Sequence, residues 1–273
     1  MSHTDDELDE FSQWERQVWE SRAAPYAASM TRLTGGAAPA LLDAAGVGAG
    51  TAMLDVATGP GVVAALARDR GATVIAVDQS EAMVNLARTG GIDAHQASVE
   101  QLPFDDATFD AVVAGFLLNH LARPAKGISE MARVCRGRVA LSVWDMPAAN
   151  PVLGLFGSVA ASLDAPDAVP PGPASDMYAD EDRLRSVLED AGLDQVEVRR
   201  VGWTLTVEPG EWFEAVAAST PRTGAVLADV QVGERATLRK RYVEVATTSF
   251  GGPDGRVTLP AGAVVASGRP RSG

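Results

Sequence analysis

An apolar segment that ends in an acid and breaks into a glycine turn constrains this chain more than any other feature. It reads Leu54-Asp55-Val56-Ala57-Thr58-Gly59-Pro60-Gly61, and a helical run over residues 62–70 follows it. A second acid, Asp78, ends the next apolar segment, seventeen residues after Gly61. Glycines in such a turn let the backbone approach a ligand closely, and an acid after the second strand faces ribose hydroxyls. The pattern therefore predicts a nucleoside-bearing ligand at the carboxyl edge of a parallel sheet.

The same turn fits two classes of cofactor. Gly59-x-Gly61-x-x-Ala64 also satisfies the dinucleotide fingerprint, so an NAD(P)-dependent reductase is one interpretation. A dinucleotide presents a diphosphate to the turn, which the carboxylate of Asp55 would repel. S-adenosylmethionine instead presents an ammonium and a sulfonium group, which that carboxylate attracts. We therefore predict S-adenosyl-L-methionine as the cofactor.

The catalytic residues of a short-chain reductase are also missing from this sequence. Short-chain reductases use a Tyr-x-x-x-Lys pair, but Met30, Asp182 and Ala246 stand four residues after the three tyrosines. A further alternative is a protein that binds the cofactor and has lost catalysis, and the intact Asp55, Gly59, Gly61 and Asp78 argue against it.

Composition narrows the classes of molecule that the chain is expected to bind. The formal net charge of −13 argues against a nucleic-acid backbone as the main ligand, because such binding needs clustered Lys and Arg. No apolar run reaches the roughly 20 residues of a membrane span, and the acidic N-terminus lacks a signal-peptide core, so we expect a cytoplasmic protein. The single cysteine, Cys135, excludes an intrachain disulfide and a cysteine metal cluster, and we expect it to be a buried, unreactive thiol.

Strand and helix patterns alternate over the middle of the chain. Such alternation implies right-handed crossovers and a parallel sheet. The expected strands lie at 52–57, 73–78, 92–96, 109–115 and 138–144, and the expected helices at 61–70, 80–88 and 124–134.

The two flanks read differently. Residues 1–10 are expected to form a charged, mobile tail, and 11–34 helical segments interrupted at Pro25. After Asp145 the chain is rich in proline up to residue 176. The other expected elements are helices at 39–45, 152–163, 179–191, 210–219 and 233–249 and strands at 193–207 and 263–267. We therefore expect one domain over 39–273 with a tail and helical cap over 1–38 and lid or substrate-binding insertions at 147–178 and 209–250.

Four motifs together resemble those of the class I S-adenosylmethionine-dependent methyltransferases. They cover residues 54–61, 77–83, 102–110 and 130–134, and the resemblance is strong over about 40–145 and loose elsewhere. Within that family the chain looks closest to the branch of quinone C-methyltransferases and actinobacterial natural-product methyltransferases. The resemblance implies an α/β, Rossmann-like fold with a seven-stranded, mostly parallel sheet flanked by helices.

The resemblance also implies which residues hold the cofactor. Asp55, Ala57, Thr58 and Gly59 should contact its methionine part, and Gly61 lets the following helix begin close to it. The contacts implied beside the methyl donor, at the end of the fourth strand, are Gly115 and Phe116.

The adenosine half is implied in the same way. Asp78 should hold the ribose hydroxyls, with Gln79 and Met83 beside the adenine. Ser98 and Val99 stand where the family commonly has Asp-Ala, so a weaker bond from Ser98 to the adenine amino group is expected.

Other charged residues in these motifs have structural explanations. Asp105, Asp106 and Asp110 are expected at a turn and at the entry to a buried strand. Glu130 and Arg133 are expected to pair on a helix surface.

Candidate catalytic residues follow from the chemistry of methyl transfer. The reaction needs an aligned nucleophile and often a base, and no metal. His120 follows the fourth strand, where the fold places its substrate, and is either that base or a packing residue. Asp145 either orients His120, accepts a substrate N–H or is a turn residue. Trp144 either stacks on the substrate or belongs to the core, and Tyr26 is predicted to contact cofactor or substrate.

These expectations define a function. The substrate should be a small, apolar, aromatic or polycyclic natural-product scaffold, with methylation at carbon favoured over oxygen or nitrogen and the C3 position of an indole as the first specific candidate. A homodimer is predicted as well, because an exposed Trp14 and Trp19 would leave an apolar patch on an acidic monomer.

Overall fold

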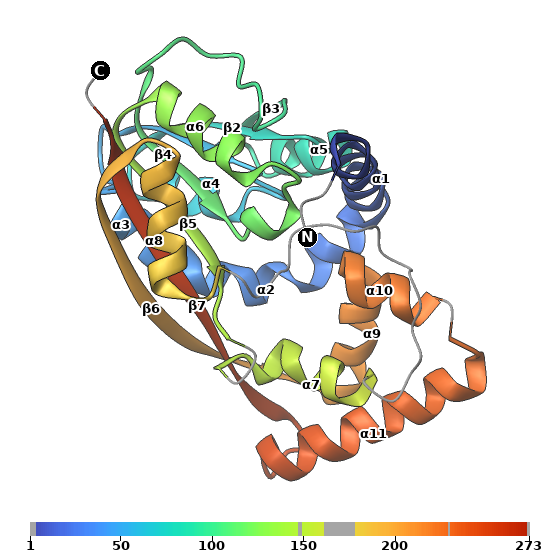
Figure 1. The fold of residues 1–273 in the computed structure, drawn as a ribbon. Coiled ribbons are helices and arrows are strands. Elements are labelled where there is room, and N and C mark those ends of the chain that lie inside the picture. The colour runs from blue at the N-terminus through green and yellow to red at the C-terminus, as the bar shows by residue number, and fades with distance from the viewer. Residues whose placement is uncertain (1–3, 147–148, 161–177, 229, 272–273) are drawn as a thin grey trace.

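Seven strands of the described chain form one sheet, seen here in a computed structural model that describes residues 4–146, 149–160, 178–228 and 230–271. The strands are β1 (Ala52–Val56), β2 (Thr73–Asp78), β3 (Asp93–Gln96), β4 (Phe109–Gly115), β5 (Cys135–Trp144), β6 (Leu193–Val207) and β7 (Val257–Pro270). Their order is β3-β2-β1-β4-β5-β7-β6 (Figure 1). The first five pair in parallel, and β7 is antiparallel to both of its neighbours. The predicted seven-stranded, mostly parallel α/β fold is confirmed.

Helices cover both faces of this sheet because its central strands are apolar on both sides. On β1, Met53 packs in one cluster with Leu41, whereas its neighbour Leu54 packs in another with Ile128 and Met131. Successive strand residues point to opposite faces, so two helical layers are needed. One layer comprises α3 (Ala38–Ala44), α4 (Val62–Asp69) and α5 (Glu81–Thr89), and the other α6 (Pro124–Val134) and α8 (Glu181–Asp190).

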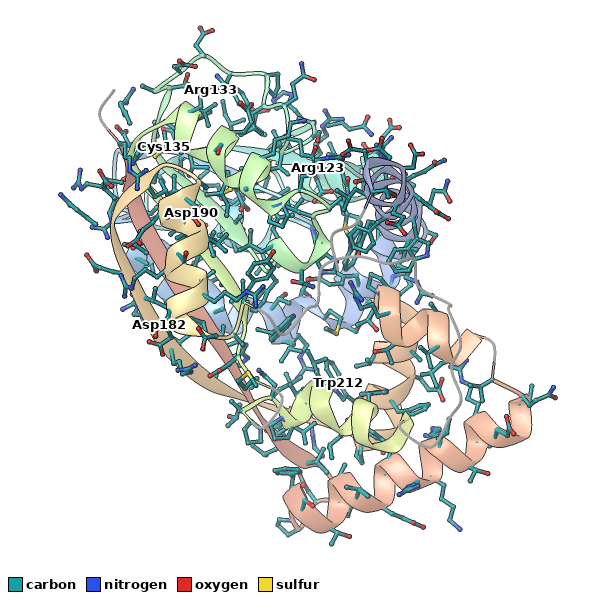
Figure 2. All side chains as sticks on the ribbon, viewed as in Figure 1. Arg123, Arg133, Cys135, Asp182, Asp190 and Trp212 are labelled. Atoms are coloured by element: carbon teal, nitrogen blue, oxygen red, sulfur yellow. The ribbon has the colours of Figure 1, made fainter. Side chains whose placement is uncertain are left out.

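A second core lies beyond the sheet, where β6 and β7 continue as a two-stranded ribbon. Helices pack on it at the lower right of Figure 1: α7 (Pro151–Ala160), α9 (Pro209–Ser219), α10 (Pro221–Ala228) and α11 (Val232–Phe250). Trp212 of α9 is buried there, and its Nε1 donates to the carbonyl of Val152 at 3.2 Å (Figure 2). Helix α10 was not predicted from the sequence.

Strand β7 is longer than the predicted 263–267. It pairs with β6 from Val257 opposite Val207 to Pro270 opposite Leu193. Pro260 is unusual inside a strand, but β5 pairs with β7 only from Ala263 onward. Pro260 therefore lies where one edge of β7 has no strand beside it, and a missing N–H is tolerated at such an edge.

One long helix, α1 (Asp5–Ser29), forms most of the N-terminal segment, so the tail predicted for 1–10 is wrong from Asp5 onward, and the predicted break at Pro25 is wrong as well. Thr4 caps the helix, and the side chain of Glu7 bonds back to the backbone N–H of Thr4. Pro25 removes one backbone hydrogen bond, which a 25-residue helix held by packing can absorb. Three short elements are α2 (Thr31–Thr34) and the 3₁₀ turns η1 (Gly35–Ala37) and η2 (Leu118–His120).

The expected proline-rich lid at 147–178 lies largely outside the described residues. Its described part contains α7, which begins at Pro151 as the apolar pattern from 152 predicted. Among the helices that are described, none combines the length and apolar character that a membrane crossing requires.

Candidate active site

The glycine turn after β1 holds three alternate residues in the left-handed region. The φ angles are 55° at Ala57, 54° at Gly59 and 90° at Gly61. A Cβ built on Gly59 would meet nothing closer than the Tyr26 ring at 4.0 Å, so its backbone is open toward the cavity. A Cβ on Gly61 would lie 3.1 Å from Ile92, because there the backbone packs against the core. The two glycines therefore serve different purposes: ligand approach at Gly59 and helix packing at Gly61.

Asp55 is buried beneath this turn and ties it to α4. Its Oδ2 accepts from the Thr58 hydroxyl at 2.7 Å and from the Ala64 N–H at 3.1 Å. Burial raises the pKa of Asp55 to about 7, and the nearby charge of Asp78 adds to the rise. A cation bound close to the Asp55 carboxylate would lower this pKa again, which agrees with the predicted preference for a positively charged cofactor.

Asp78 closes the other side of the turn. Its Oδ2 accepts from the Gly59 N–H and its Oδ1 from the Ser80 N–H, both at 2.9 Å. Burial raises the pKa of Asp78 to about 6, opposed by these bonds and assisted by the charge of Glu20. The two buried carboxylates thus fix the backbone on which the ligand is predicted to lie.

Helix α1 reaches this edge through Glu20, which sequence reasoning missed. Glu20 Oε2 accepts from the Ser80 hydroxyl at 2.7 Å, and Oε1 accepts from the Ala82 N–H at 3.1 Å. The carboxylate therefore binds the N-terminus of α5, where an acid is favoured. The N-terminal helix is docked directly beside the predicted ribose site.

Two adjoining cavities open at this edge. The smaller, of about 50 Å³, is lined by Asp55, Thr58, Gly59, Gly115 and Ser142 among others. The larger, of about 310 Å³, brings together most of the predicted cofactor residues: Ala57, Gly59, Asp78, Gln79, Met83, Val99, Gly115 and Phe116.

One predicted cofactor residue does not reach either cavity. Ser98 is exposed, and its hydroxyl accepts from the Glu100 N–H at 3.2 Å. Its neighbours Ala97 and Val99 line the larger cavity instead, because successive residues of the extended chain point in opposite directions. The predicted contact of the Ser98 side chain with the adenine is therefore not supported.

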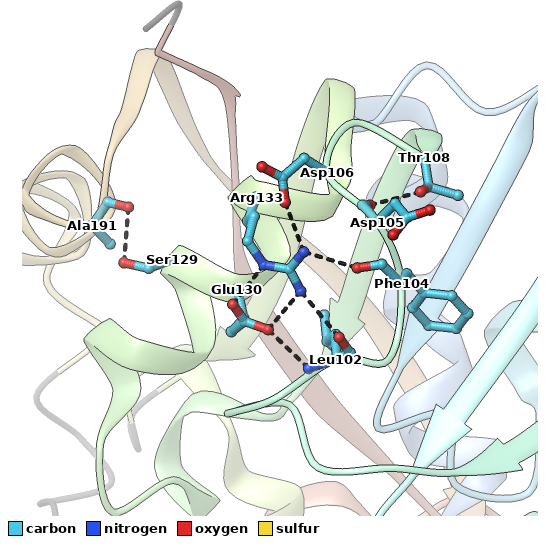
Figure 3. Close-up of polar contacts among 9 residues, drawn as sticks. All are labelled: Leu102, Phe104, Asp105, Asp106, Thr108, Ser129, Glu130, Arg133 and Ala191. Carbon is cyan, nitrogen blue, oxygen red and sulfur yellow. Dashed lines mark hydrogen bonds and ion pairs between the residues drawn. The ribbon is translucent and has the colours of Figure 1, made fainter.

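The loop beside Val99 is held from α6 by the predicted Glu130–Arg133 pair, whose role is larger than expected (Figure 3). Arg133 donates to the carbonyls of Leu102 and Phe104 at 3.0 and 2.8 Å and pairs with Asp106 at 2.8 Å. Glu130 in turn accepts from the Leu102 N–H at 2.8 Å. The pair therefore clamps the loop over 102–106.

His120 lies in the wall of the larger cavity, with an unexpected partner. Its Nδ1 is 3.0 Å from Oε2 of Glu15, a residue of α1 whose side chain is 1 % exposed. Its Nε2 is 3.0 Å from the Asn119 amide nitrogen. The Trp19 ring stands edge-on to the imidazole, with centroids 5.1 Å apart. Glu15 was not predicted from the sequence. Its spacing of four residues from both Phe11 and Trp19 was a signal, because it places a carboxylate on the same helix face as these aromatic residues.

Asp145 does not orient His120, so that prediction is wrong. Its Oδ1 accepts from its own neighbour, the Met146 N–H, at 2.7 Å and pairs with Arg200 at 3.1 Å. It lines a separate, shallow surface cavity. The physical reason is the alternation of the strand end: Trp144 points into the larger cavity, so Asp145 points away from it.

Two aromatic side chains complete the wall. Trp144 stacks on Phe116 with ring centroids 4.0 Å apart. Tyr26 lines both cavities, stands edge-on to Trp19 at 5.2 Å, and its hydroxyl donates to the Thr34 hydroxyl at 3.4 Å. Burial raises the pKa of Tyr26, and the charge of Asp78 adds to the rise. Tyr26 is therefore a neutral hydrogen-bond donor rather than a base.

Two further side chains with potentially reactive groups, Cys135 and His95, line neither cavity. Cys135 is buried, and burial raises the pKa of its thiol to about 11, as expected for an unreactive side chain. His95 is exposed and pairs with Asp93 at 2.9 Å, outside both cavities. Within the described residues, no group of three or more His, Cys, Asp or Glu side chains could hold a metal ion.

The edge fits a cofactor that carries a cation and a nucleoside. The smaller cavity contains a buried acid, Asp55, and the Ser142 hydroxyl, which is buried without a hydrogen-bond partner in the described parts of the chain. An open glycine backbone and a second acid at Asp78 adjoin it. Such groups suit an amino-acid moiety next to a ribose.

Comparison with known proteins agrees with this geometry. Residues 54–142 match the methyltransferase domain family. The chain is 30 % identical over 180 residues to the ubiquinone/menaquinone biosynthesis C-methyltransferase UbiE of Escherichia fergusonii, covering 57 % of this chain and 71 % of that protein. It is 36 % identical over 106 residues to the demethylmenaquinone methyltransferase of Clavibacter sepedonicus, covering 36 % and 43 %.

Solved structures share the fold. The YcgJ protein of Bacillus subtilis superposes with a TM-score of 0.56 at 18 % identity, covering 87 % of this chain and 99 % of that one. A Haemonchus contortus phosphoethanolamine N-methyltransferase, solved with S-adenosylhomocysteine, superposes with a TM-score of 0.56 at 15 % identity, covering 96 % and 61 %. Together with the site, these matches set aside the NAD(P)-dependent reductase. The chain belongs to the class I methyltransferases and is an S-adenosylmethionine-dependent enzyme.

Proposed function

We propose that this enzyme methylates a small aromatic or polycyclic natural-product scaffold, at carbon in preference to oxygen or nitrogen, with the C3 position of an indole as the first candidate. The observation that carries the proposal is the larger cavity, which joins the cofactor residues Gly59 and Asp78 to a wall of aromatic rings and His120. A substrate in that cavity would lie against both the cofactor and a base.

The character of the wall supports an aromatic substrate. Trp19, Phe116 and Trp144 line it together with aliphatic side chains such as Met30 and Leu153. Flat rings gain both buried apolar area and favourable edge or stacked contacts in such surroundings. A strongly polar substrate would lose hydration there without replacement.

The chemistry assigned to the chain is proton removal and alignment. S-adenosylmethionine supplies an electrophilic methyl group on a positively charged sulfur and leaves as the neutral thioether. His120 accepts at Nε2 the proton that the substrate loses when its N–H or O–H becomes part of the nucleophile. Tyr26 lines both cavities and stays protonated, so its hydroxyl serves there as a hydrogen-bond donor.

The cap supports the exclusion of water. We assign residues 1–38 to this cap and 147–178 and 209–250 to lid segments over one methyltransferase domain. Trp19 of α1 and the residues 220–223 at the start of α10 line the larger cavity opposite the sheet. Water kept away from the methyl donor cannot compete with the substrate.

A quinol ring is the second candidate substrate. The relatives in Escherichia fergusonii and Clavibacter sepedonicus are named for quinone biosynthesis and demethylmenaquinone. A quinol also attacks through carbon while an O–H proton leaves, so the same base and the same aromatic wall would serve it.

Labelled methyl transfer tests the proposal. The purified protein is incubated with methyl-¹³C cofactor and matched panels of indoles, quinols and phenols, and products are analysed by mass spectrometry and carbon NMR. We expect a labelled methyl group on a ring carbon of an indole or, second, a quinol. Products labelled only at oxygen or nitrogen, or S-adenosylhomocysteine binding without turnover of any aromatic, would refute it.

The predicted homodimer and cytoplasmic location remain predictions. The two tryptophans on which the dimer was predicted have partners within the chain, because Trp19 lies in the cavity wall and Trp14 packs near Phe11 with ring centroids 6.1 Å apart. The large apolar side chains that are exposed in the described chain are Met146 and Val232. Light scattering at micromolar concentration decides between monomer and dimer.

A further inference from the structure

Glu15 occupies a position where a carboxylate needs a specific reason. It lies on the buried face of α1 one turn from Phe11 and from Trp19, and its side chain is 1 % exposed. Its Oε1 is buried and has no hydrogen-bond partner in the described parts of the chain. An apolar residue would avoid the desolvation that such a carboxylate suffers. The contact that the structure provides for it is His120, 3.0 Å from Oε2.

The neighbours of His120 fix how its protons are arranged. The Asn119 amide nitrogen, a donor, lies 3.0 Å from Nε2, so Nε2 accepts and the ring proton sits on Nδ1. That Nδ1–H then points at the Glu15 carboxylate. The ring keeps 18 % of its side-chain surface exposed and lines the larger cavity. A substrate proton can therefore reach the lone pair of Nε2 by taking the place of the Asn119 amide hydrogen.

We propose that Glu15 is the positioning residue of the catalytic base. It holds His120 as the Nδ1–H tautomer and stabilises the imidazolium that forms when Nε2 takes the proton from the substrate. The proton moves from the substrate N–H or O–H to Nε2, and the electron pair left behind belongs to the nucleophile. A carboxylate that orients a histidine and stabilises its charged form is a general device of acid–base catalysis. The inference rests on the proposed role of His120 as base.

Other charged groups near the imidazole make contacts of their own. Arg123 pairs with Asp5 and Asp9 near the start of α1. Arg222 of α10 lies over the Phe11 ring at 5.9 Å and lines the same cavity. The remaining groups nearby are Asp78, bonded to Gly59 and Ser80, Glu20, bonded to Ser80 and Ala82, and the neutral Tyr26. Glu15 is the carboxylate in direct contact with the ring.

The base and the carboxylate that positions it come from two distant parts of the chain. Glu15 and His120 are 105 residues apart and meet only where α1 docks over the edge of the sheet. The same helix is held beside the ribose site by Glu20. Glu10 lies five residues before Glu15 on the same helix and is exposed, so it is a control of the same chemical type.

The test compares Glu15→Gln with Glu10→Gln. Glutamine keeps the shape and an acceptor oxygen but removes the charge. We expect Glu15→Gln to lower kcat about 10- to 100-fold, the range found for partners that orient metal-binding histidines. The acid limb of its pH–rate profile should move to lower pH, because an imidazolium without its anionic partner forms less readily. Glu10→Gln should leave the acid limb in place.

A second readout does not use turnover. The chain has three histidines, so the ring signals of His120 can be assigned by comparison with His120→Gln in ¹⁵N NMR. In the protein without substrate, the ring nitrogens of His120 should report the Nδ1–H tautomer in the parent and in Glu10→Gln, and less of it in Glu15→Gln. Circular dichroism and S-adenosylhomocysteine affinity, both expected to stay near the parent values, show that the variant is folded.

The outcomes separate the two claims. A folded Glu15→Gln whose acid limb and His120 tautomer both stay as in the parent overturns the positioning role. A changed tautomer with parental kcat also overturns it, because the contact would then be structural only. Parental turnover in a His120→Ala variant instead overturns the base assignment itself.

Discussion

The cofactor edge and the cap over it are built by different means. At the edge, the bonds that shape the site join residues close in sequence: Ala64 to Asp55 over nine positions and Gly59 to Asp78 over nineteen. In the cap, the contacts are remote: His120 meets Glu15 over 105 positions, and Arg22 donates to the Ala217 carbonyl over 195. A short motif can specify the first kind of site completely. The second exists only after the chain has folded.

The two regions also differ in how they treat charge. At the edge, Asp55 and Asp78 are buried near one another, and burial raises the pKa of both, to about 7 and about 6. In the cap, the buried Glu15 faces a histidine that can carry the opposite charge. The edge is therefore strained electrostatically until a cation arrives, whereas the cap carries its own counter-charge.

The largest expected effect tests whether the histidine that the cap contacts does chemistry. Replacing His120 with Ala should lower turnover by about 10²–10⁴, the usual contribution of a positioned acid or base. S-adenosylhomocysteine affinity, measured by calorimetry, should change little, because the bonds that shape the edge do not involve His120. The control His95→Ala, at an exposed position paired with Asp93, should leave both quantities unchanged. Near-parental turnover over the whole pH range would make His120 a packing residue.

The next largest effect tests the cost of burying Asp55, which should show in how the free energy of unfolding depends on pH. Because the pKa of Asp55 is about 7 when folded and 3.8 ordinarily, the folded protein keeps a proton between pH 4 and 7 that the unfolded chain has released. The contribution of Asp55 to stability is therefore fully present below pH 4 and is lost as pH rises to 7. Asp55→Asn removes this titration, so its free energy of unfolding should gain on the parent from pH 4 to 7, by on the order of 4 kcal/mol at most.

Urea unfolding of ligand-free protein at four pH values between 4 and 8 measures this gain. The exposed turn residue Asp105 gives a matched control, because Asp105→Asn should show a nearly constant difference from the parent. A difference for Asp55→Asn that does not grow with pH would mean that the carboxylate is ionised in the folded protein at no cost.

The same contrast explains what the sequence could and could not predict. The strands at 73–78, 109–115 and 193–207 were predicted to the residue, because their apolar runs end at glycines, acids or turns. Two elements of the flanks were predicted less well. Pro25 lies inside α1, and Pro260 inside β7, because packing and an unpaired strand edge tolerate what local rules forbid.

At the site, single residues could be predicted from the sequence, but the side chain that pairs with His120 could not. Asp55, Asp78 and His120 were found from the sequence alone, since motif position places each of them at a strand end. The partner of His120 was assigned to Asp145, the nearest acid on the same rim, and is Glu15 of α1. Register at a strand end and the docking of a distant helix decide such a choice, and a single sequence records neither.

A smaller effect tests the edge directly. Asp78→Ala should weaken S-adenosylhomocysteine binding by about 1.5–3 kcal/mol, roughly 10- to 150-fold, because a charged acceptor of hydrogen bonds is lost. The Gly59 and Ser80 N–H groups would lose their partner in the same change. Asp93→Ala, at an exposed position on the neighbouring strand, is the control and should bind as the parent does. Calorimetry that finds equal affinities would show that Asp78 shapes the turn without touching the ligand.

The smallest expected effect asks whether the edge is stable without help from the cap. Arg133 holds the loop over 102–106 from α6 through the carbonyls of Leu102 and Phe104 (Figure 3). Arg133→Ala should therefore lower the free energy of unfolding by about 1–2 kcal/mol, as expected when hydrogen bonds to a charged group are lost from a partly exposed site. Lys126→Ala on the same helix, whose half-exposed ammonium pairs with Glu100 at 3.2 Å, should cost about 0.5 kcal/mol or less. Urea unfolding measures both.

Turnover and S-adenosylhomocysteine affinity of folded Arg133→Ala should stay near parental values, since the Arg133 side chain lines neither cavity. If the variant instead loses turnover while keeping its stability, the loop communicates with the cap, and the separation between the two regions does not hold.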